Sequence, residues 1–267
     1  MLFGVQAQSL ASATVTSGSR HPDTRCCGSL QFPRQTQLQL DESTDSWGEL
    51  SLTLQQAYDL ELKTRGQIYN PDWFQARNSR LTASVFGKIM TRKQAVTPQF
   101  VKSIFDPKPF RSEATDHGIK NESKAKQKFL LQNPQAHFHD IGLVVNPSFP
   151  FIGASPDAKI CLLGETGIAE VKCPFKHRNE TIREACTDQE FCLEPDNDGH
   201  YRLKDTHSHW FQVQGQLLVT GAPFCMFIVH TNPETVAIKI EPNHDTMKAI
   251  LTKMNSFYSK YAPVNFS

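Results

Sequence analysis

The stretch GASPDAKICLLGETGIAEVK, residues 153–172, decides the fold predicted for this chain. One short β-rich run, Lys159–Leu163, lies within it, and a second, Ile168–Cys173, extends one residue beyond it. Between them stands Gly164-Glu-Thr-Gly167, a sequence typical of a tight turn. The pattern predicts a β-hairpin that forms the middle of a sheet.

Three charged residues accompany this hairpin. Asp157 precedes the first run, and after twelve intervening residues Glu170 and Lys172 lie two apart in the second. Side chains alternate along a strand, so Glu170 and Lys172 leave one face while Ala169 and Val171 leave the other. Because a hairpin returns the second strand beside the first, we expect the three charged groups to converge at one end of the sheet.

These residue types suit phosphodiester hydrolysis. Carboxylates such as Asp157 and Glu170 are the hard oxygen ligands that Mg²⁺ takes in small number, and the backbone carbonyl of Val171 is a natural further ligand. Mn²⁺ is expected to substitute. The ammonium of Lys172 can orient a nucleophile and stabilise developing negative charge. Glu122 lies on an inward face of a predicted helix, where a carboxylate requires a cation. A lone Glu-x-Lys on a strand is more commonly a solvated face, so the preceding Pro-Asp and Glu122 carry the argument.

The rest of the chain predicts a mixed α/β domain with a central mixed sheet flanked by helices. Apolar residues recur at helical spacing in four segments and at strand spacing in four shorter ones. We expect helices over 52–63, from a cap at Thr82 or Ser84 to Met90, over 113–131 and over 208–220, strands at 142–145, 151–154, 224–230 and 236–241, and a closing amphipathic helix.

Composition places limits on domain organisation and location. The 267 residues carry a net charge of +1, so any contact with nucleic acid requires a local basic surface. Residues 1–48 are rich in Ser, Thr and Gln and predict a disordered tail, followed by a single domain over 49–267 with a surface insertion at about 179–207. No secretory signal or membrane span is recognisable. We expect a nuclear or cytoplasmic protein, with a mitochondrial location less favoured.

The motifs Gly153-Ala-Ser-Pro-Asp157 and Glu170-Val-Lys-Cys-Pro-Phe175 resemble those of the YqaJ-like viral recombinases, the family of the bacteriophage lambda exonuclease within the PD-(D/E)XK nucleases. The resemblance extends over roughly residues 70–262. It implies a restriction-endonuclease-like core and Mg²⁺-dependent, 5′-to-3′ digestion of one strand of duplex DNA, in recombination or repair.

The same resemblance implies roles for individual residues. Asp157 and Glu170 become metal ligands, with Glu122 near the metals, and Lys172 assists the nucleophilic water. Gln212 corresponds to a glutamine on the helix that borders the site.

Gln214 is the alternative to Gln212, because it shares a helical face with Trp210 and Leu217. The family also implies a trimeric homo-oligomer and a single-strand-annealing partner. The insertion at 179–207 departs from the phage pattern, which leaves the oligomer open.

Phosphate-binding residues follow from position as well. Arg77 and Ser84 resemble a pair that holds a 5′-terminal phosphate, and Arg178 resembles a third group of that pocket. A helix that starts near Thr82 or Ser84 offers free amides to an anion, and arginine gives forked contacts to phosphate. The alternative interpretation makes Arg77 and Arg80 ordinary surface charges.

Two other functions and one alternative interpretation of the Cys and His residues remain open. The first is an endonuclease of the same fold, which, unlike an exonuclease, cuts closed circular DNA. The second is a catalytically silent DNA-binding or scaffold protein, although no acidic ligand and no lysine is missing. The third is a structural zinc site, but the spacing of the candidate ligands fits no compact finger. These candidates are Cys173, His177, Cys186, Cys192, His200, His207 and His209.

Overall fold

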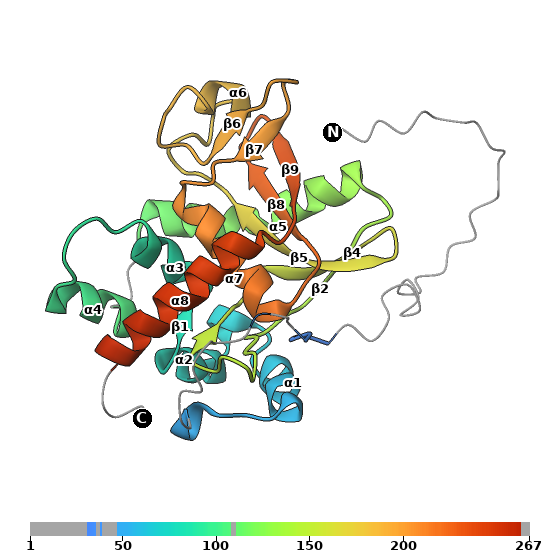
Figure 1. Ribbon diagram of the computed structural model, residues 1–267. Coiled ribbons are helices and arrows are strands. Elements are labelled where there is room, and N and C mark those ends of the chain that lie inside the picture. Colours follow the sequence, from blue (N-terminus) through green and yellow to red (C-terminus); the bar gives the residue numbers. More distant parts are fainter. Residues whose placement is uncertain (1–30, 36–37, 39–46, 108–110, 263–267) are drawn as a thin grey trace, which may run out of the picture.

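The computed structural model describes residues 31–35, 38, 47–107 and 111–262. A five-stranded sheet lies at its centre, with the strand order β2-β4-β5-β8-β9 (Figure 1). Strands β5 and β8 are parallel, and the other neighbouring pairs are antiparallel. The strands are β2 (His137–His139), β4 (Ala158–Leu162), β5 (Glu165–Lys172), β8 (Cys225–His230) and β9 (Thr235–Ile240).

Strands β4 and β5 form the predicted hairpin, but its turn is tighter than expected. Leu163 and Gly164 have positive φ angles of 51° and 83° and form a two-residue connection. The predicted turn residues Glu165 to Gly167 instead belong to β5. A side chain at Gly167 would come within 2.5 Å of the Phe224 carbonyl oxygen, so glycine permits the close approach of the chain at β8.

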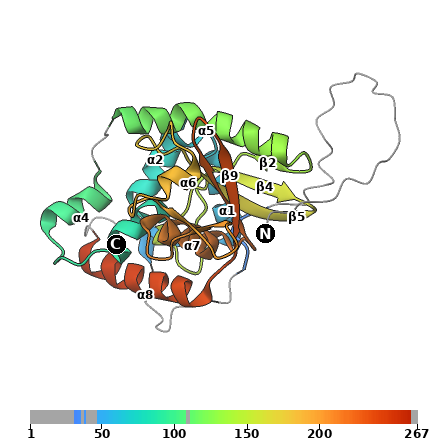
Figure 2. The same cartoon turned by 90° about the horizontal axis from the view of Figure 1, so that it is seen from above.

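Helices cover both faces of the sheet, as Figure 2 shows. Helix α5 (Glu113–Gln132) lies on one face, where Ala125 and Phe129 pack with Ile160, Val171 and Ile228. Helices α3 (Ala83–Met90), α7 (Ser208–Thr220) and α8 (His244–Tyr261) form the other layer, which encloses the larger core. The mixed α/β fold with a central mixed sheet flanked by helices is therefore confirmed.

Helix α7 lies close to α3 because two glycines remove the side chains between them. A Cβ at Gly215 would come within 2.2 Å of the Phe86 ring, and a Cβ at Gly87 within 2.5 Å of the Ser208 carbonyl oxygen. Interiors this dense tolerate no added methyl group. This contact fixes the height of α7 above the sheet and hence the reach of its side chains toward β5.

The remaining elements lie around this core. Helix α1 (Leu54–Lys63) agrees with the prediction, as do α3, α5, α7 and α8. Helices α2 (Pro71–Asn78) and α4 (Pro98–Phe105) were not foreseen. Residues 142–145 form no strand, although Val144 bridges Ala154. No described helix is long and apolar enough to cross a membrane. The further elements are η2 (Gly48–Leu50), α1 (Leu54–Lys63), η3 (Gln67–Tyr69), α2 (Pro71–Asn78), β1 (Leu81–Thr82), α4 (Pro98–Phe105) and β3 (Ile152–Gly153).

The predicted insertion contains structure of its own. Helix α6 (Ile182–Ala185) and the β6–β7 hairpin (Leu193–Pro195 and Tyr201–Leu203) lie in it. Ile182 and Phe191 are buried and join the main hydrophobic core. The insertion is thus anchored to the domain by apolar packing.

The tail predicted over residues 1–48 needs correcting at one point, and most of it lies outside the described residues. Phe32 is fully buried in the main core, and the Arg34 amide donates to the Thr220 carbonyl oxygen at 2.8 Å. A buried phenylalanine stabilises by roughly 2–3 kcal/mol, which is enough to hold a short segment against the domain.

A buried charge cluster fastens α1 to the strand-bearing half of the domain. The Glu61 carboxylate accepts two hydrogen bonds from Arg65, both of 3.0 Å, and one from the Gly142 amide at 3.0 Å. Lys159 lies 3.3 Å away, and both side chains of this pair are only 4% exposed. Burial by itself raises the pKa of Glu61, but these hydrogen bonds and the nearby cations outweigh it and lower the pKa below its ordinary value.

We predict that Glu61→Gln lowers the free energy of unfolding by about 3 kcal/mol at neutral pH, since it removes the buried carboxylate charge that Arg65 and Lys159 both contact. The pKa of Glu61 is lowered on folding, so its stabilisation is present above pH 4.5 and is lost as the pH falls through the folded-state pKa. The variant should therefore lose less stability on acidification than the wild type, as measured by urea unfolding.

A matched control is Glu165→Gln, because the Glu165–Lys239 pair lies at the surface with side chains 62% and 42% exposed. Glu165→Gln should lower the free energy of unfolding by less than about 1 kcal/mol. Equal losses in the two variants would contradict a special role for the buried cluster.

Candidate active site

The predicted convergence of three charged groups is present at the start of β4 and the end of β5. The Asp157 amide donates to the Ala169 carbonyl oxygen at 3.0 Å, and its Oδ2 accepts from the Val171 amide at 2.7 Å. Lys172 Nζ donates to Glu170 Oε1 at 2.7 Å. The hairpin thus holds Asp157 across from the segment that carries Glu170 and Lys172.

Helix α7 completes the surroundings of Glu170, which is only 3% exposed. Gln212 Nε2 donates to Glu170 Oε1 at 2.6 Å, and Gln216 Nε2 donates to Oε2 at 2.7 Å. Gln212 Oε1 also accepts from Lys172 Nζ at 3.1 Å. Both carboxylate oxygens are therefore held by donors, and the lysine is fixed beside them.

The structure places Gln212 at the site, as predicted, but excludes the alternative Gln214. Gln214 donates to the Glu241 carbonyl oxygen at 3.0 Å and accepts from the Asn243 amide at 2.8 Å, on the side of α7 that faces away from Glu170. Gln216 was missed. Gln216 is four residues from Gln212, so the two side chains lie on one helical face. This spacing is the feature of the sequence that could have indicated Gln216.

Electrostatics make this cluster a site for a cation. Burial, together with the nearby carboxylates of Glu170 and Glu122, raises the pKa of Asp157 well above its ordinary value. Burial tends to lower the pKa of Lys172, but Glu170 and Asp157 outweigh it and raise that pKa. The ammonium thus stays charged, and the raised pKa of Asp157 shows that a second negative charge is disfavoured there unless a further cation neutralises it.

Glu122 lies near this cluster but already has a cationic partner. Lys126 Nζ lies 2.6 Å from Glu122 Oε1, one helical turn away, and also donates to the Asp157 carbonyl oxygen at 2.7 Å. The Glu122 side chain is 39% exposed. The cation expected beside Glu122 is therefore at least in part Lys126, which ties α5 to the start of β4.

The donor set fits a hard divalent cation. Asp157 and Glu170 offer carboxylate oxygens close enough that Glu170 helps to raise the pKa of Asp157. Their hydrogen bonds described above come from amide and ammonium nitrogens, with no sulfur or imidazole among the donors. Mg²⁺ prefers few carboxylate ligands and keeps several waters. The Val171 amide donates to Asp157. The role of the Val171 carbonyl as a metal ligand stays a prediction.

Arg77 lies in a group of hydroxyls next to the Ser155-Pro-Asp157 segment. Its guanidinium contacts Thr82 Oγ1 at 3.2 Å and the hydroxyls of Ser84 and Ser155 at 3.4 Å each. It also stacks over the Trp73 ring, 4.1 Å from the centroid. Burial lowers the pKa of Arg77 to about 10. Among the described residues no carboxylate pairs with this half-buried cation, so the group can receive an anion. Ser155 was not foreseen.

Arg77 and Arg80, which the alternative interpretation treats as ordinary surface charges, each make specific contacts. Arg77 belongs to the hydroxyl group just described, whereas Arg80 donates to the Pro150 and Ala76 carbonyl oxygens, each at 2.9 Å. Arg80 is therefore a structural connector, and Arg77 alone is arranged for a ligand.

Arg178 contacts different residues from those around Arg77. Its Nη1 donates to the Phe175 carbonyl oxygen at 2.7 Å, and the guanidinium stacks over the Phe175 ring at 4.1 Å. No contact to Arg77 or Ser84 is found in the described part of the chain. The structure does not bring Arg178 into that group, and its phosphate-binding role stays a prediction.

The zinc alternative gains no support. His177 is held between Glu180 at 2.8 Å and Asp188 at 3.1 Å. Within the described ranges, the one group of three metal-ligating side chains near enough to share an ion is Asp196, Asp198 and His200, at the β6–β7 turn, and it contains no cysteine. The scattered Cys and His residues therefore form no compact zinc site there.

A pocket of about 360 Å³ adjoins Lys172. The insertion contributes one side of it through Phe191, Cys192 and His207, and Phe175 lines it as well. Lys172 is therefore accessible from a concave surface that is partly aromatic.

The family model of the YqaJ-like viral recombinase domain matches residues 72–223. The chain belongs to this family. The matched span contains the Arg77 group, the hairpin and Gln216, so the site lies entirely within the recombinase domain. A search of curated proteins finds no match.

Solved structures share the fold of this recombinase domain. An alkaline exonuclease from Laribacter hongkongensis, LHK-Exo, has a TM-score of 0.55 at 23% identity, over 71% of this chain and 91% of its own. SOX in a DNA complex has a TM-score of 0.52 at 15% identity, over 79% and 71%. KSHV SOX in an RNA complex has 0.51 at 13%, over 79% and 74%. These similarities establish the nuclease fold.

We predict that Gln216→Leu weakens Mn²⁺ binding by about tenfold, because it frees Glu170 Oε2 from the donor that orients it. Gln214→Leu is the matched control on the same helix and should leave Mn²⁺ affinity within about twofold, although it also removes a buried hydrogen-bonding side chain. Isothermal titration with MnCl₂ measures both. Equal weakening in the two variants would show that the effect is structural.

Proposed function

We propose that this protein is a divalent-metal-dependent deoxyribonuclease that digests duplex DNA from its ends in the 5′-to-3′ direction, in recombination or repair. The observation that carries the proposal is the joint placement of Asp157, Glu170 and Lys172 with Gln212. Membership of the recombinase family and the nuclease fold of its structural neighbours support it. No acidic ligand and no lysine of the motif is missing, which disfavours a silent scaffold.

Mg²⁺, with Mn²⁺ as a substitute, would be held by Asp157 and Glu170, with Glu122 and the Val171 carbonyl as further candidates. When bound, such an ion lowers the pKa of a water and neutralises charge on the phosphate. The protein's own contribution is to hold the carboxylates at fixed positions. Gln212, Gln216 and Lys172 do this for Glu170, and the Val171 amide does it for Asp157.

Lys172 is the group placed to act on the nucleophile. Its ammonium is fixed by Glu170 and Gln212, and its raised pKa keeps it protonated at neutral pH. It lines the concave pocket beside the carboxylates. A positioned cation there can orient an attacking water and stabilise charge that develops on the phosphate.

The Arg77 group would bind the terminal phosphate of the substrate. A guanidinium without a carboxylate partner, surrounded by the hydroxyls of Thr82, Ser84 and Ser155, matches the geometry of phosphate recognition. Ser155 is two residues before Asp157, so an end held by Arg77 lies next to the carboxylates. This adjacency favours an exonuclease over the endonuclease alternative.

Nucleic acid is the proposed partner in any form of this function. The structural neighbours include SOX in a DNA complex and in an RNA complex, which supports a nucleic-acid substrate. A homo-oligomer and a single-strand-annealing partner remain proposals that rest on the family.

A digest of end-labelled linear DNA and closed circular DNA with Mg²⁺ tests the proposal. Linear duplex should be shortened from its 5′ ends, circular DNA should persist, and EDTA should stop the reaction. Cutting of the circle would establish the endonuclease alternative, and inertness on both substrates with Mg²⁺ and Mn²⁺ would contradict nuclease function.

We predict that Lys172→Ala lowers the rate of cleavage by about a thousandfold, since it removes the cation beside the reacting phosphate. Duplex binding, followed by fluorescence anisotropy in Ca²⁺, should change by less than about threefold. The control is Lys239→Ala, which removes a lysine that is 42% exposed on β9, outside the pocket, and should retain the wild-type rate. Wild-type cleavage by Lys172→Ala would show that the site is assigned wrongly.

We predict that Arg77→Ala reduces the preference for 5′-phosphorylated over 5′-hydroxyl ends by about tenfold, because it removes the forked contact to the phosphate. Arg178→Ala is expected to reduce the same preference if its family role holds. The exposed Arg202→Ala serves as control and should leave the ratio unchanged. An equal loss of rate on both kinds of end in Arg77→Ala would count against an end pocket.

A further inference from the structure

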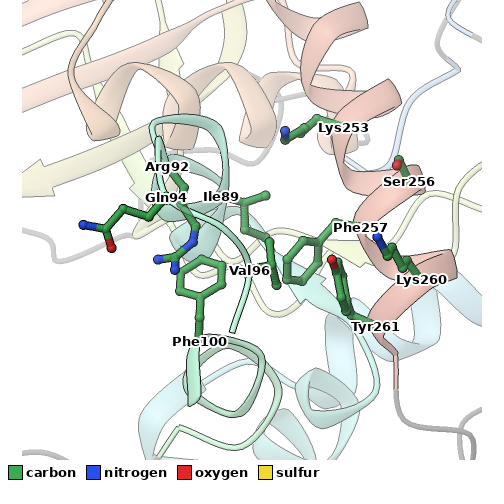
Figure 3. A pocket seen from close by; sticks show the side chains of 10 residues that line it. All are labelled: Ile89, Arg92, Gln94, Val96, Phe100, Lys253, Ser256, Phe257, Lys260 and Tyr261. Carbon is green, nitrogen blue, oxygen red and sulfur yellow. The ribbon is translucent and has the colours of Figure 1, made fainter. Parts of the chain in front are cut away.

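A second concave site lies on the side of the domain formed by α3, α4 and α8. Figure 3 shows this pocket, of about 200 Å³, between the end of α3, the segment that leads to α4, and the last turns of α8. Its apolar lining comes from Ile89, Val96, Phe100, Phe257 and Tyr261. None of these residues belongs to the candidate active site.

Three cations surround the apolar lining, and no acidic residue lines the pocket. These are Arg92, Lys253 and Lys260 (Figure 3). In the described part of the chain, none of the three forms an ion pair with a carboxylate. The pocket therefore combines an apolar interior with an uncompensated positive rim, which favours a ligand that is apolar at its centre and negative around it.

The spacing of the two lysines indicates the size of that ligand. Lys253 and Lys260 are seven residues apart on α8, with Ser256 and Phe257 between them on the same helical face. Seven residues of helix span about 10 Å, which about three residues of extended peptide also span. The interior is smaller than pockets for drug-sized ligands, which begin at about 300 Å³, and suits a single side chain.

The aromatic rings are not arranged to stack nucleic-acid bases. Arg92 covers the face of Phe100, 4.0 Å from its centroid. Phe257 packs edge-on against Phe100 and in a stacked arrangement against Phe105, with centroids 6.1 Å apart in each case. A platform for single-stranded DNA requires exposed ring faces, whereas an anchoring side chain requires only apolar walls.

We propose that this pocket binds a short acidic segment of a partner protein. One apolar side chain of that segment enters the pocket and packs against Ile89, Val96 and Phe257, and carboxylates on either side of it pair with Lys253 and Lys260. The site lies outside the residues assigned to cleavage, so the inference stands independently of the nuclease function.

The test measures binding of the full-length protein to a fluorescein-labelled hexapeptide, Asp-Glu-Phe-Leu-Asp-Glu, by fluorescence anisotropy. Saturable binding is expected, and it should be lost when Phe and Leu of the peptide are replaced by Ser, or when its acids are replaced by amides. Lys253→Glu and Lys260→Glu should each weaken binding by about tenfold. The matched control Lys248→Glu reverses an exposed lysine on the same helix outside the pocket and should change affinity by less than about twofold.

Each other outcome overturns the proposal. The proposal is wrong if the peptide shows no saturable binding. It is also wrong if Lys248→Glu weakens binding as much as Lys253→Glu and Lys260→Glu, which would indicate a diffuse charge effect. Labelled oligothymidylate is measured with the same variants. If it binds through Lys253 and Lys260 while the peptide does not, the pocket is a nucleic-acid surface instead.

Discussion

The structure depends on one buried carboxylate, that of Glu170. It lies on β5, between β4 and β8, where water cannot solvate it, and an unpaired charge there would cost several kcal/mol. Lys172, Gln212 and Gln216 together hold both of its oxygens. Two of these partners come from α7, so the charge on the sheet determines where that helix must lie.

The packing of the domain is consistent with this requirement. Gly215 allows α7 to approach the Phe86 ring, and Gly87 allows the start of α7 to approach α3. The hairpin supplies the other half of the site, because its two-residue turn fixes the register that pairs Ala158 with Ala169 and so brings Asp157 within hydrogen-bond distance of Ala169 and Val171. The same contacts that stabilise the fold therefore hold two carboxylates and one ammonium in fixed positions, which is the preorganisation that catalysis of phosphodiester hydrolysis requires.

The sequence was sufficient for the hairpin and its charged face, because alternation along a strand is a local property. It was insufficient for the choice between Gln212 and Gln214 and for finding Gln216, since both depend on the rotation of α7 relative to a sheet formed by distant residues. The short helices α2 and α4 were missed because each buries a single residue, Trp73 or Ile104, whereas α3, equally short, buries four. The tight turn at Leu163 was misplaced because a positive φ at leucine has no indication in sequence. Placement of Arg178 likewise depends on the conformation of a loop.

The central claim is that Asp157 and Glu170 share a divalent cation. Anomalous diffraction from crystals soaked in MnCl₂ tests it most directly. The account predicts a Mn²⁺ peak within coordination distance of carboxylate oxygens of both residues, next to Lys172. Manganese bound only elsewhere, for instance by Asp196, Asp198 and His200 at the β6–β7 turn, with no peak between Asp157 and Glu170, would contradict it.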